Sequence, residues 1–528
     1  MIEENKKGYI KHFLIAGLYS IICGFITGII IFIFKFIAKN IEEVSIHLLS
    51  KARISFIGVM ITLIVLAVLA TLMYLLQKKV PEIKGGGIPK SEGVLRGIFR
   101  LRGLKTLIGT LFGSMLSYMA GVPVGTEGPS VLIGTSAGII CNKTSKKHKA
   151  LERYIGTSGA AAGFAVATGA PFSGILFALE EIHKRFTPML VVTTSLAVLS
   201  ATFVNITLCN IFDISPNLFV FTSNIVFEYK DIIYFVILGL LIALIVGIFD
   251  KTIGLIFKLS SKKIIKIHPL FKLIIIFIIS GLLGMYFIEC VYSGHDIIQS
   301  LISTDIDNFT IIMLLAILLI RFIFMFLVID SGVTGGIFIP TMAIAAVIGV
   351  LFGKLLLLIG MDESYVPVII ILTMCAFIGG TLRAPFTAAI FFVELTGSFN
   401  NIFYIILVIF IVNFIVEIFD QPSFYDRTLE KMHAEIKEEE TVEYCTVIVS
   451  ENSFVVGKSI RDIMWPHCLV LLKIERCSEN YEKLNSDGET KIYANDKISF
   501  RCAFSNEKEF LEDIYSLVGN TNLTKFEE

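Results

Sequence analysis

Two short motifs rich in Gly and Pro interrupt long apolar stretches, and they constrain the fold of this chain more than any other feature. The first is GTEGP at residues 125–129 and the second is GGIFIP at 335–340. Each lies between apolar segments, so we expect each to end one membrane helix and begin the next. A helix that begins inside the protein presents unpaired N–H groups and the positive end of its dipole, which suits an anion. Glu127 sits at one such break, and an ionisable side chain there indicates a transport site with a titratable gate.

Apolar residues dominate the chain as a whole. Of 528 residues, 55% are hydrophobic and 44 are Phe, and the mean hydropathy is +0.80. These values predict an all-α polytopic membrane protein. Many apolar segments are shorter than the ~20 residues that a full crossing needs, so we expect broken, re-entrant or tilted helices. The segments are 14–37, 54–76, 106–120, 129–141, 154–180, 187–212, 232–249, 270–290, 310–329, 340–359, 366–380, 384–396 and 402–419.

The distribution of charge predicts the orientation in the membrane. The formal net charge is zero, which gives no reason to expect a nucleic acid as partner. Basic residues cluster near the N-terminus, in three later groups and after Arg427, whereas segments 203–229 and 288–309 contain no Lys or Arg. By the positive-inside rule both termini are expected in the cytoplasm. No cleavage pattern follows the first apolar segment, so we interpret it as a retained helix.

The nine cysteines are scattered, without a CxxC pair or a His spacing typical of zinc. The sequence therefore indicates no metal site and no cofactor. A bridge between Cys209 and Cys290 is one option, but unpaired thiols are expected.

The two halves of the apolar region resemble each other. The stretch from Ala170 to Glu180 aligns with the stretch from Ala384 to Glu394 at a constant offset, and an offset three residues smaller aligns 125–129 with 336–340. The second alignment places Glu127 opposite Phe338. Paired broken segments in two halves are typical of a repeat-built transporter with its site near the membrane midplane.

The composition changes after Phe419. A charged stretch leads into a linker at 431–442, and short alternating runs at 446–449, 468–474 and 497–500 predict strands. An amphipathic stretch at 509–518 predicts a helix. We expect residues 443–528 to form a small α+β domain.

The motifs resemble those of the CLC family of chloride channels and proton-coupled chloride transporters. Residues 10–430 follow the order of that family. The resemblance implies a fold of inverted repeats, a homodimer with one pathway per subunit, and chloride and protons as the transported species. The matching motifs are GGGIP at 85–89, GTEGP at 125–129, GAPFSGILFALEEI at 169–182, GGIFIP at 335–340, LRAPFTAAIFFVELTG at 382–397 and FYD at 424–426.

The resemblance assigns roles to two acids. Glu127 matches the external gating glutamate, whose ionised form occupies the anion site and whose protonated form swings away. A capping acid at a helix start is the structural alternative. Glu181 matches the internal proton site of coupled relatives, although Glu180 and Glu181 together could also be a solvated helix end.

The resemblance also implies an anion site. It consists of the backbone N–H groups of Ile337 and Phe338, the position of Gly86, and the hydroxyl of Tyr425, with Phe424 as the alternative if the register shifts by one. Two positions depart from the family pattern. Gly86 replaces a serine, which removes a hydroxyl donor and puts the anion selectivity in doubt, and Thr126 replaces an arginine, which removes a positive charge beside Glu127. Pro129 and the match at Glu181 argue against the fluoride-exporting branch.

The C-terminal domain resembles a TrkA-C (RCK-C) regulatory module through VVGKSI at 455–460, LVLLKI at 469–474 and NDKI at 495–498. This resemblance implies a small-molecule ligand of unspecified identity.

We therefore expect a chloride/proton antiporter of the plasma membrane, and no enzyme. A passive voltage- or pH-gated chloride channel of the same family is the alternative, but the acid at position 181 favours antiport. A potassium channel or uptake subunit is a remote alternative, because the chain has no TVGYG-like filter. An ATP-driven pump is not supported, because the chain has no phosphate-binding loop.

Overall fold

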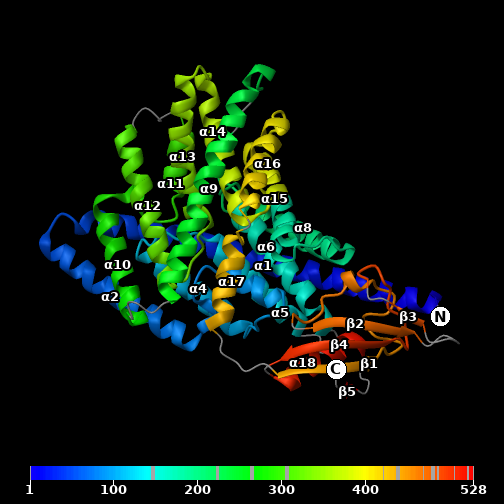
Figure 1. Ribbon diagram of the computed structural model, residues 1–528. Coiled ribbons are helices and arrows are strands. Elements are labelled where there is room, and N and C mark those ends of the chain that lie inside the picture. The colour runs from blue at the N-terminus through cyan, green and yellow to red at the C-terminus, as the bar shows by residue number, and fades with distance from the viewer. Residues whose placement is uncertain are drawn as a thin grey trace.

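A computed structural model describes residues 2–143, 149–219, 221, 225–261, 267–303, 309–419, 421–435, 441–467, 469–476, 482–484, 487–504, 506–519 and 523–526. Within these ranges the chain forms a helical membrane part followed by a small domain with a β-sheet (Figure 1).

Eight of the described helices are long and apolar enough to cross a membrane, so the chain is a multi-pass membrane protein. In Figure 1, α9, α12, α13 and α14 pack side by side. The helix that holds the first apolar segment extends well beyond it, to Ala52. The eight are α1 (Ile2–Ala52), α2 (Phe56–Lys79), α8 (Pro188–Ile211), α9 (Ile232–Ser261), α10 (Pro269–Tyr286), α12 (Ile311–Ser331), α13 (Phe338–Leu358) and α14 (Val366–Leu382) with its 3-10 turn Glu363–Tyr365.

Shorter helices fill the space between these spans, as the broken apolar segments predicted. The apolar segment 154–180 is divided at Gly169, whose φ of 69° ends one helix, and Pro171 begins the next. The shorter helices are α3 (Ile88–Leu95), α4 (Leu104–Met119), α5 (Glu127–Lys143), α6 (Glu152–Thr168), α7 (Pro171–Phe177) with its π-helical turn η3 (Ala178–Ile182), α11 (His295–Ile302), α15 (Pro385–Thr396), α16 (Ile402–Ile418) and α17 (Phe424–Glu435).

Helices α5 and α6 cross at the centre of the first half, and glycine makes their close approach possible. A Cβ atom added at Gly134 would lie 2.0 Å from the carbonyl oxygen of Gly159, and a Cβ atom added at Gly159 would lie 2.0 Å from the carbonyl oxygen of Gly134. Small residues at a crossing let two backbones approach closely and gain dispersion energy where lipid provides no hydrophobic driving force. The crossing therefore holds the start of α5 in a fixed place.

The internal repeat of the sequence is present in the fold. Helices α5, α6, α7 and α8 correspond in order to α13, α14, α15 and α16, and the junctions between the second and third helices match in detail. Gly169 in one half and Arg383 in the other adopt the left-handed conformation, and Pro171 and Pro385 then begin the short helices. The two short helices, α7 and α15, pack against each other.

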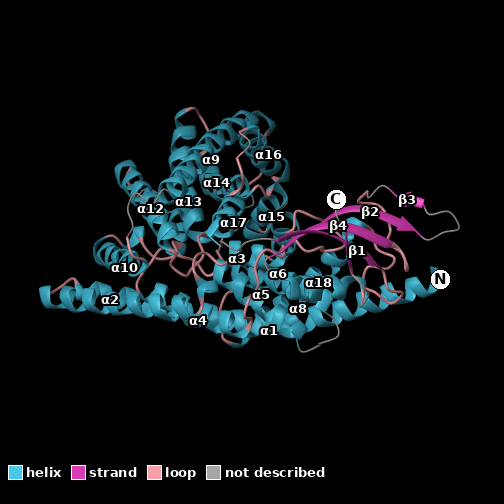
Figure 2. Ribbon diagram, turned by 60° about the horizontal axis from the view of Figure 1, so that its bottom comes forward, coloured by secondary structure: helices cyan, strands magenta, loops and turns pink. Residues whose placement is uncertain are grey.

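The C-terminal sheet has five antiparallel strands in the order β3-β2-β4-β1-β5, with α18 (Glu507–Val518) packed on it (Figure 2). The ring centroids of Phe500, in the sheet, and Phe510, in α18, lie 6.2 Å apart. Strands were expected at three of these places and a helix at 509–518. The strands are β1 (Thr441–Ile448), β2 (Leu469–Arg476), β3 (Glu482–Leu484), β4 (Lys497–Phe504) and β5 (Thr524–Phe526).

The sheet domain contacts the start of α6 and the start of α1. The Arg153 guanidinium donates to the carbonyl oxygens of Met464 and Trp465 at 3.0 and 2.9 Å, and also to that of Leu95 in α3 at 2.7 Å. The rings of His12 and Phe454 lie 5.5 Å apart. Both ends of the described chain therefore lie on the same side of the membrane part (Figure 2). Cys209 and Cys290 are free, in agreement with the expectation of unpaired thiols.

Candidate functional site

The two motifs that dominate the sequence meet in space. The amide of Gly125 donates to the carbonyl oxygen of Gly336 at 2.6 Å, and the amide of Gly336 donates to that of Gly125 at 2.9 Å. The GGGIP motif joins them, because the amide of Gly85 donates to the carbonyl oxygen of Gly332 at 3.1 Å. Three turns that are far apart in the sequence thus form one hydrogen-bonded cluster.

The glycines of this cluster are required by the closeness of its backbones. A Cβ atom at Gly128 would lie 1.9 Å from the carbonyl oxygen of Gly86, and Gly87 has a φ of 83°. Side chains at these two positions would separate the turns. At Gly86 itself an added Cβ atom would meet only the carbonyl oxygen of Gly335, at 3.7 Å, which is an ordinary contact.

Three helices begin at this cluster. Helix α3 begins at Ile88, α5 at Glu127 and α13 at Phe338, with Ile337 as the N-cap of α13. The N–H groups in the first turn of a helix have no partner within the helix, and the helix dipole adds partial positive charge there. Helix starts that converge on one place make a site suited to an anion.

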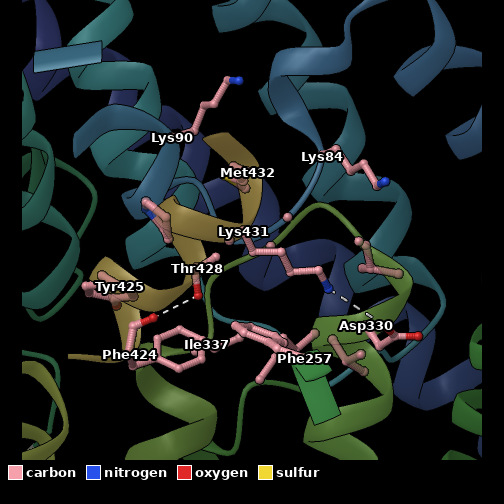
Figure 3. Close-up of a pocket in the computed structure, with 18 of the residues that line it drawn as sticks. Lys84, Lys90, Phe257, Asp330, Ile337, Phe424, Tyr425, Thr428, Lys431 and Met432 are labelled. Carbon is pink, nitrogen blue, oxygen red and sulfur yellow. Dashed lines mark hydrogen bonds and ion pairs between the residues drawn. The ribbon is translucent and has the colours of Figure 1, made fainter. Parts of the chain in front are cut away.

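A cavity of about 420 Å³ leads to this cluster (Figure 3). Gly86, Ile337 and Tyr425 line it, and a second cavity of about 20 Å³ is bordered by Ile337, Phe338 and Tyr425. The four predicted anion-site residues therefore lie together. Tyr425 is 2% exposed. Phe424, the alternative at that position, borders both cavities as well.

The larger cavity is basic. Lys84, Lys90, Lys272 and Lys431 line it, and Asp330 is the carboxylate among its described lining residues. Asp330 accepts from Lys272 at 2.6 Å. It also lies 4.0 Å from Lys431, and the dashed line between these two side chains in Figure 3 marks this ion pair. The excess of positive charge attracts anions to the mouth of the cluster.

The Glu127 carboxylate lies at the beginning of α5, inside the protein. Glu127 is 1% exposed. Its Oε1 accepts from the hydroxyl of Thr126 at 3.1 Å, and its Oε2 has no hydrogen-bond partner in the part of the chain that the structure describes. Oε2 turns back towards Gly125, where an added Cβ atom would come within 2.4 Å of it. The hydrogen bond from Thr126 thus reaches Oε1 alone.

The adjacent acids Glu180 and Glu181 have different environments. Glu180 accepts hydrogen bonds from the amides of Phe386 and Thr387 at 3.0 and 2.7 Å and from the Thr387 hydroxyl at 2.7 Å, so it caps α15. Glu181 is fully buried, and neither of its carboxyl oxygens has a hydrogen-bond partner among the described residues. The reading of both acids as a solvated helix end is therefore wrong, because Glu181 is buried and Glu180 is a helix cap.

Arg96 contacts the backbone of Glu181 and pairs with Glu92, and sequence reasoning had singled out neither Arg96 nor Glu92. Arg96 donates to the backbone carbonyl oxygens of Glu181 and Ile182 at 3.1 and 2.8 Å. It also lies 2.5 Å from the carboxylate of Glu92, which is fully buried in α3. An acid three residues after GGGIP, within a buried helix, was the available signal.

Comparison with known proteins assigns the chain to a family. The sequence model described as voltage gated chloride channel matches residues 68–417, more than half of the chain. The chain belongs to the voltage gated chloride channel (CLC) family. The match includes the three glycine-rich turns, Glu127 and Glu181.

Two relatives and one solved structure extend this assignment. The chain is 23% identical over 508 residues to chloride channel protein C of Dictyostelium discoideum, which covers 81% of this chain and 66% of that protein. It is 27% identical over 388 residues to the H(+)/Cl(-) exchange transporter ClcA of Vibrio parahaemolyticus, covering 69% of this chain and 80% of the relative. The structure of a slow cyanobacterial Cl-/H+ antiporter superposes with a TM-score of 0.74 at 24% identity, covering 80% of this chain and 98% of that one. This CLC protein therefore has the CLC transporter fold.

Proposed function

We propose that this chain is a secondary active transporter that exchanges chloride for protons across the membrane. The observation that carries the proposal is the position of Glu127, an acid in the protein interior at the point where the starts of α3, α5 and α13 converge. An ionised carboxylate there competes with chloride for the same N–H groups, and a protonated one leaves them. One side chain can therefore alternate between blocking the anion and carrying a proton.

The anion is held by neutral donors in this proposal. Backbone N–H groups of Ile337 and Phe338 and the Tyr425 hydroxyl bind chloride, while Gly86 contributes no hydroxyl. The lysines of the 420 Å³ cavity draw chloride in from the cytoplasm.

Glu181 receives protons from the cytoplasmic side and passes them to Glu127. Its burial without a hydrogen-bond partner in the described part of the chain supports this role, because a structural acid would be expected to have hydrogen-bond donors around it, as Glu180 does. Antiport is favoured over a passive channel because the acid is present at position 181 and because the Vibrio relative is named as an exchange transporter.

The test is a flux measurement from liposomes that contain the purified full-length protein and are loaded with chloride. Chloride release and internal pH are recorded together. An outward chloride gradient should drive protons in the opposite direction against their own gradient. Chloride release without proton movement would establish the passive channel instead.

We propose further that two copies associate through the face formed by α7, α8, α15 and α16. Large apolar side chains are exposed there on equivalent helices of the two halves, which supports a continuous apolar surface. Chemical cross-linking in detergent should give a dimer, and a monomer alone would contradict the proposal. The exposed side chains include Phe172, Leu199, Phe203, Phe386, Phe410 and Phe414.

The remaining assignments concern location and the C-terminal part. We place both termini in the cytoplasm and the protein in the plasma membrane, on the basis of the basic clusters near both ends. Residues 1–430 form the transport domain, 431–442 the linker, and 443–528 a TrkA-C-like domain that binds a small-molecule ligand.

A further inference from the structure

We propose that Lys35, a lysine within membrane helix α1, supplies the positive charge that stabilises the ionised Glu127 carboxylate in the anion pathway. The inference deepens the proposed function and rests on it. It concerns the gating motif, in which the residue before Glu127 is the uncharged Thr126.

Lys35 directs its ammonium group into the protein. Lys35 is the single Lys, Arg, Asp or Glu residue between Lys11 and Lys39, and this part of α1 has high hydropathy. Lys39, one turn later, is exposed and lies 4.0 Å from Glu43. The Nζ of Lys35 instead donates to the carbonyl oxygen of Val166, near the end of α6, at 3.0 Å. A charged lysine in such a span is costly unless a functional partner compensates it.

Glu127 is the acid that the charge of Lys35 reaches. A Cβ atom added at Gly163 would lie 2.3 Å from the carbonyl oxygen of Ser130, so the last turn of α6, where Lys35 bonds to Val166, packs against the first turn of α5, where Glu127 lies. Helix α1 itself packs against both α5 and α6. Among the described residues no carboxylate lies within ion-pair distance of Lys35, so the lysine acts on Glu127 through its field, without direct contact. A direct ion pair would lock the gate in place. A cation at longer range favours the ionised form and leaves the carboxyl group free to move.

The other groups that face Glu127 do not provide the same charge. Tyr118 and Tyr425 are phenols, which carry no positive charge in either protonation state. His295 lies 3.9 Å from Asp296, and its ring bonds to the carbonyl oxygen of Leu218, so any positive charge on it is offset by that acid. Cys209 is the further titratable group near Lys35.

The alternative is a purely structural role, because lysines also cap the last carbonyl groups of helices. A rescue experiment separates the two. Lys35→Met removes the charge, Lys35→Arg keeps it, and the double variant Lys35→Met with Thr126→Arg restores a cation beside Glu127 without restoring the bond to Val166. Lys354→Met is the matched control. Lys354 lies in membrane helix α13 and, like Lys35, donates to a backbone carbonyl oxygen, that of Phe309, at 3.3 Å.

The measurement is chloride flux and proton movement in liposomes between pH 4 and pH 8. Without its counter-charge the gate is protonated, and therefore opens, at a higher pH. We expect the midpoint of the flux profile to rise by about one pH unit in Lys35→Met. Lys35→Arg and Lys354→Met should keep the wild-type midpoint, and the double variant should return towards it.

A Lys35→Met profile with the wild-type midpoint would overturn the proposal, as would a raised midpoint that the double variant leaves unchanged. If Lys35→Met does not fold, Thr126→Arg alone tests the same idea. A second cation near Glu127 should lower the pH midpoint of chloride flux. An unchanged midpoint in Thr126→Arg would contradict the proposal. Failure of the proposed antiport would look different. Wild-type liposomes would then release chloride without moving protons, while the pH midpoints of chloride release would still test Lys35.

Discussion

Glu180 and Glu394 each cap the short helix that bears the other. Glu180, at the end of the α7–η3 segment, accepts three hydrogen bonds at the start of α15. Glu394, in α15, accepts from the amides of Phe172 and Ser173 at 2.7 and 2.9 Å and from the Ser173 hydroxyl at 2.5 Å, at the start of α7. The two halves of the transporter are thus joined by a reciprocal pair of charged helix caps.

These caps should contribute to stability and leave transport intact. Glu180→Gln and Glu394→Gln each remove the charge from a carboxylate that accepts three bonds, and we expect each to cost about 1.5–3 kcal/mol. The loss of stability is measured by thermal unfolding in detergent, with size-exclusion chromatography as the readout of the folded fraction. Both variants should retain proton coupling. Two variants of wild-type thermal stability would contradict the role as caps.

The Glu127 carboxyl group should be required for proton movement but not for chloride movement. Glu127→Gln resembles the protonated side chain in shape and cannot release a proton. In the liposome assay we expect chloride release without any accompanying change of internal pH. Proton uptake at the wild-type rate in Glu127→Gln would remove Glu127 from the proposed mechanism.

The Glu181→Gln variant should lose proton coupling and keep chloride flux, since the chloride path reaches the cluster through the basic cavity. Glu180→Gln is the matched control, because the neighbouring acid is bound to α15 and should not exchange protons. Loss of coupling in Glu180→Gln with normal coupling in Glu181→Gln would assign the proton site to the neighbouring residue.

Position 86 should tune the anion site. The space at Gly86 accepts a Cβ atom, so Gly86→Ser can add a hydroxyl donor without moving the backbone. One more hydrogen bond to an ion is worth about 1.5–3 kcal/mol at most, so chloride should bind up to about 10- to 150-fold more tightly. We also expect lower nitrate-to-chloride and bromide-to-chloride flux ratios.

Calorimetric anion titration and mixed-anion flux test this prediction. Gly87→Ser is the control, because its Cβ atom would lie 2.4 Å from the carbonyl oxygen of Gly128 in a backbone conformation of positive φ. That variant should fold poorly. Equal affinities and flux ratios for wild type and Gly86→Ser would separate residue 86 from the selectivity of the site.

Arg153 should hold the sheet domain on the membrane part. Its guanidinium donates hydrogen bonds to the carbonyl oxygens of Leu95, Met464 and Trp465. Each bond from a charged donor contributes about 1.5–3 kcal/mol, so Arg153→Met should lower the free energy of local opening of the loop at 460–465 by a few kcal/mol. Hydrogen exchange of this loop in the intact protein measures the change.

Arg100→Met is the control for this variant. Arg100 pairs with Glu509 and Asp513 in α18 but is about half exposed, so its ion pairs should contribute at most about 1 kcal/mol. Faster exchange of the 460–465 loop in Arg100→Met than in Arg153→Met would show that the surface ion pairs are the main attachment.

The sequence alone indicated the broken helices and their meeting place. Gly and Pro within apolar stretches cannot continue a helix, so the breaks at 125–129 and 335–340 were visible without a structure. The length of α1 was not, because its last turns contain charged residues that hydropathy counts as loop. Residues 154–180 were expected as one apolar segment, although Gly169 and Pro171 carry the same signal for a break, and the structure divides the segment there.

Local pattern thus determined the membrane class, the helix breaks, the repeat and the C-terminal strands, because these depend on residues near one another in the chain. Only the tertiary structure decided which acids are buried and what surrounds them. Glu180 and Glu181 are neighbours in sequence, but adjacent helical residues point roughly 100° apart, so one reaches α15 and the other an enclosed space beside Arg96. We also propose that Lys35, about ninety residues away in the sequence, acts on Glu127, because helix packing brings α1 against α5 and an electric field depends on distance in space.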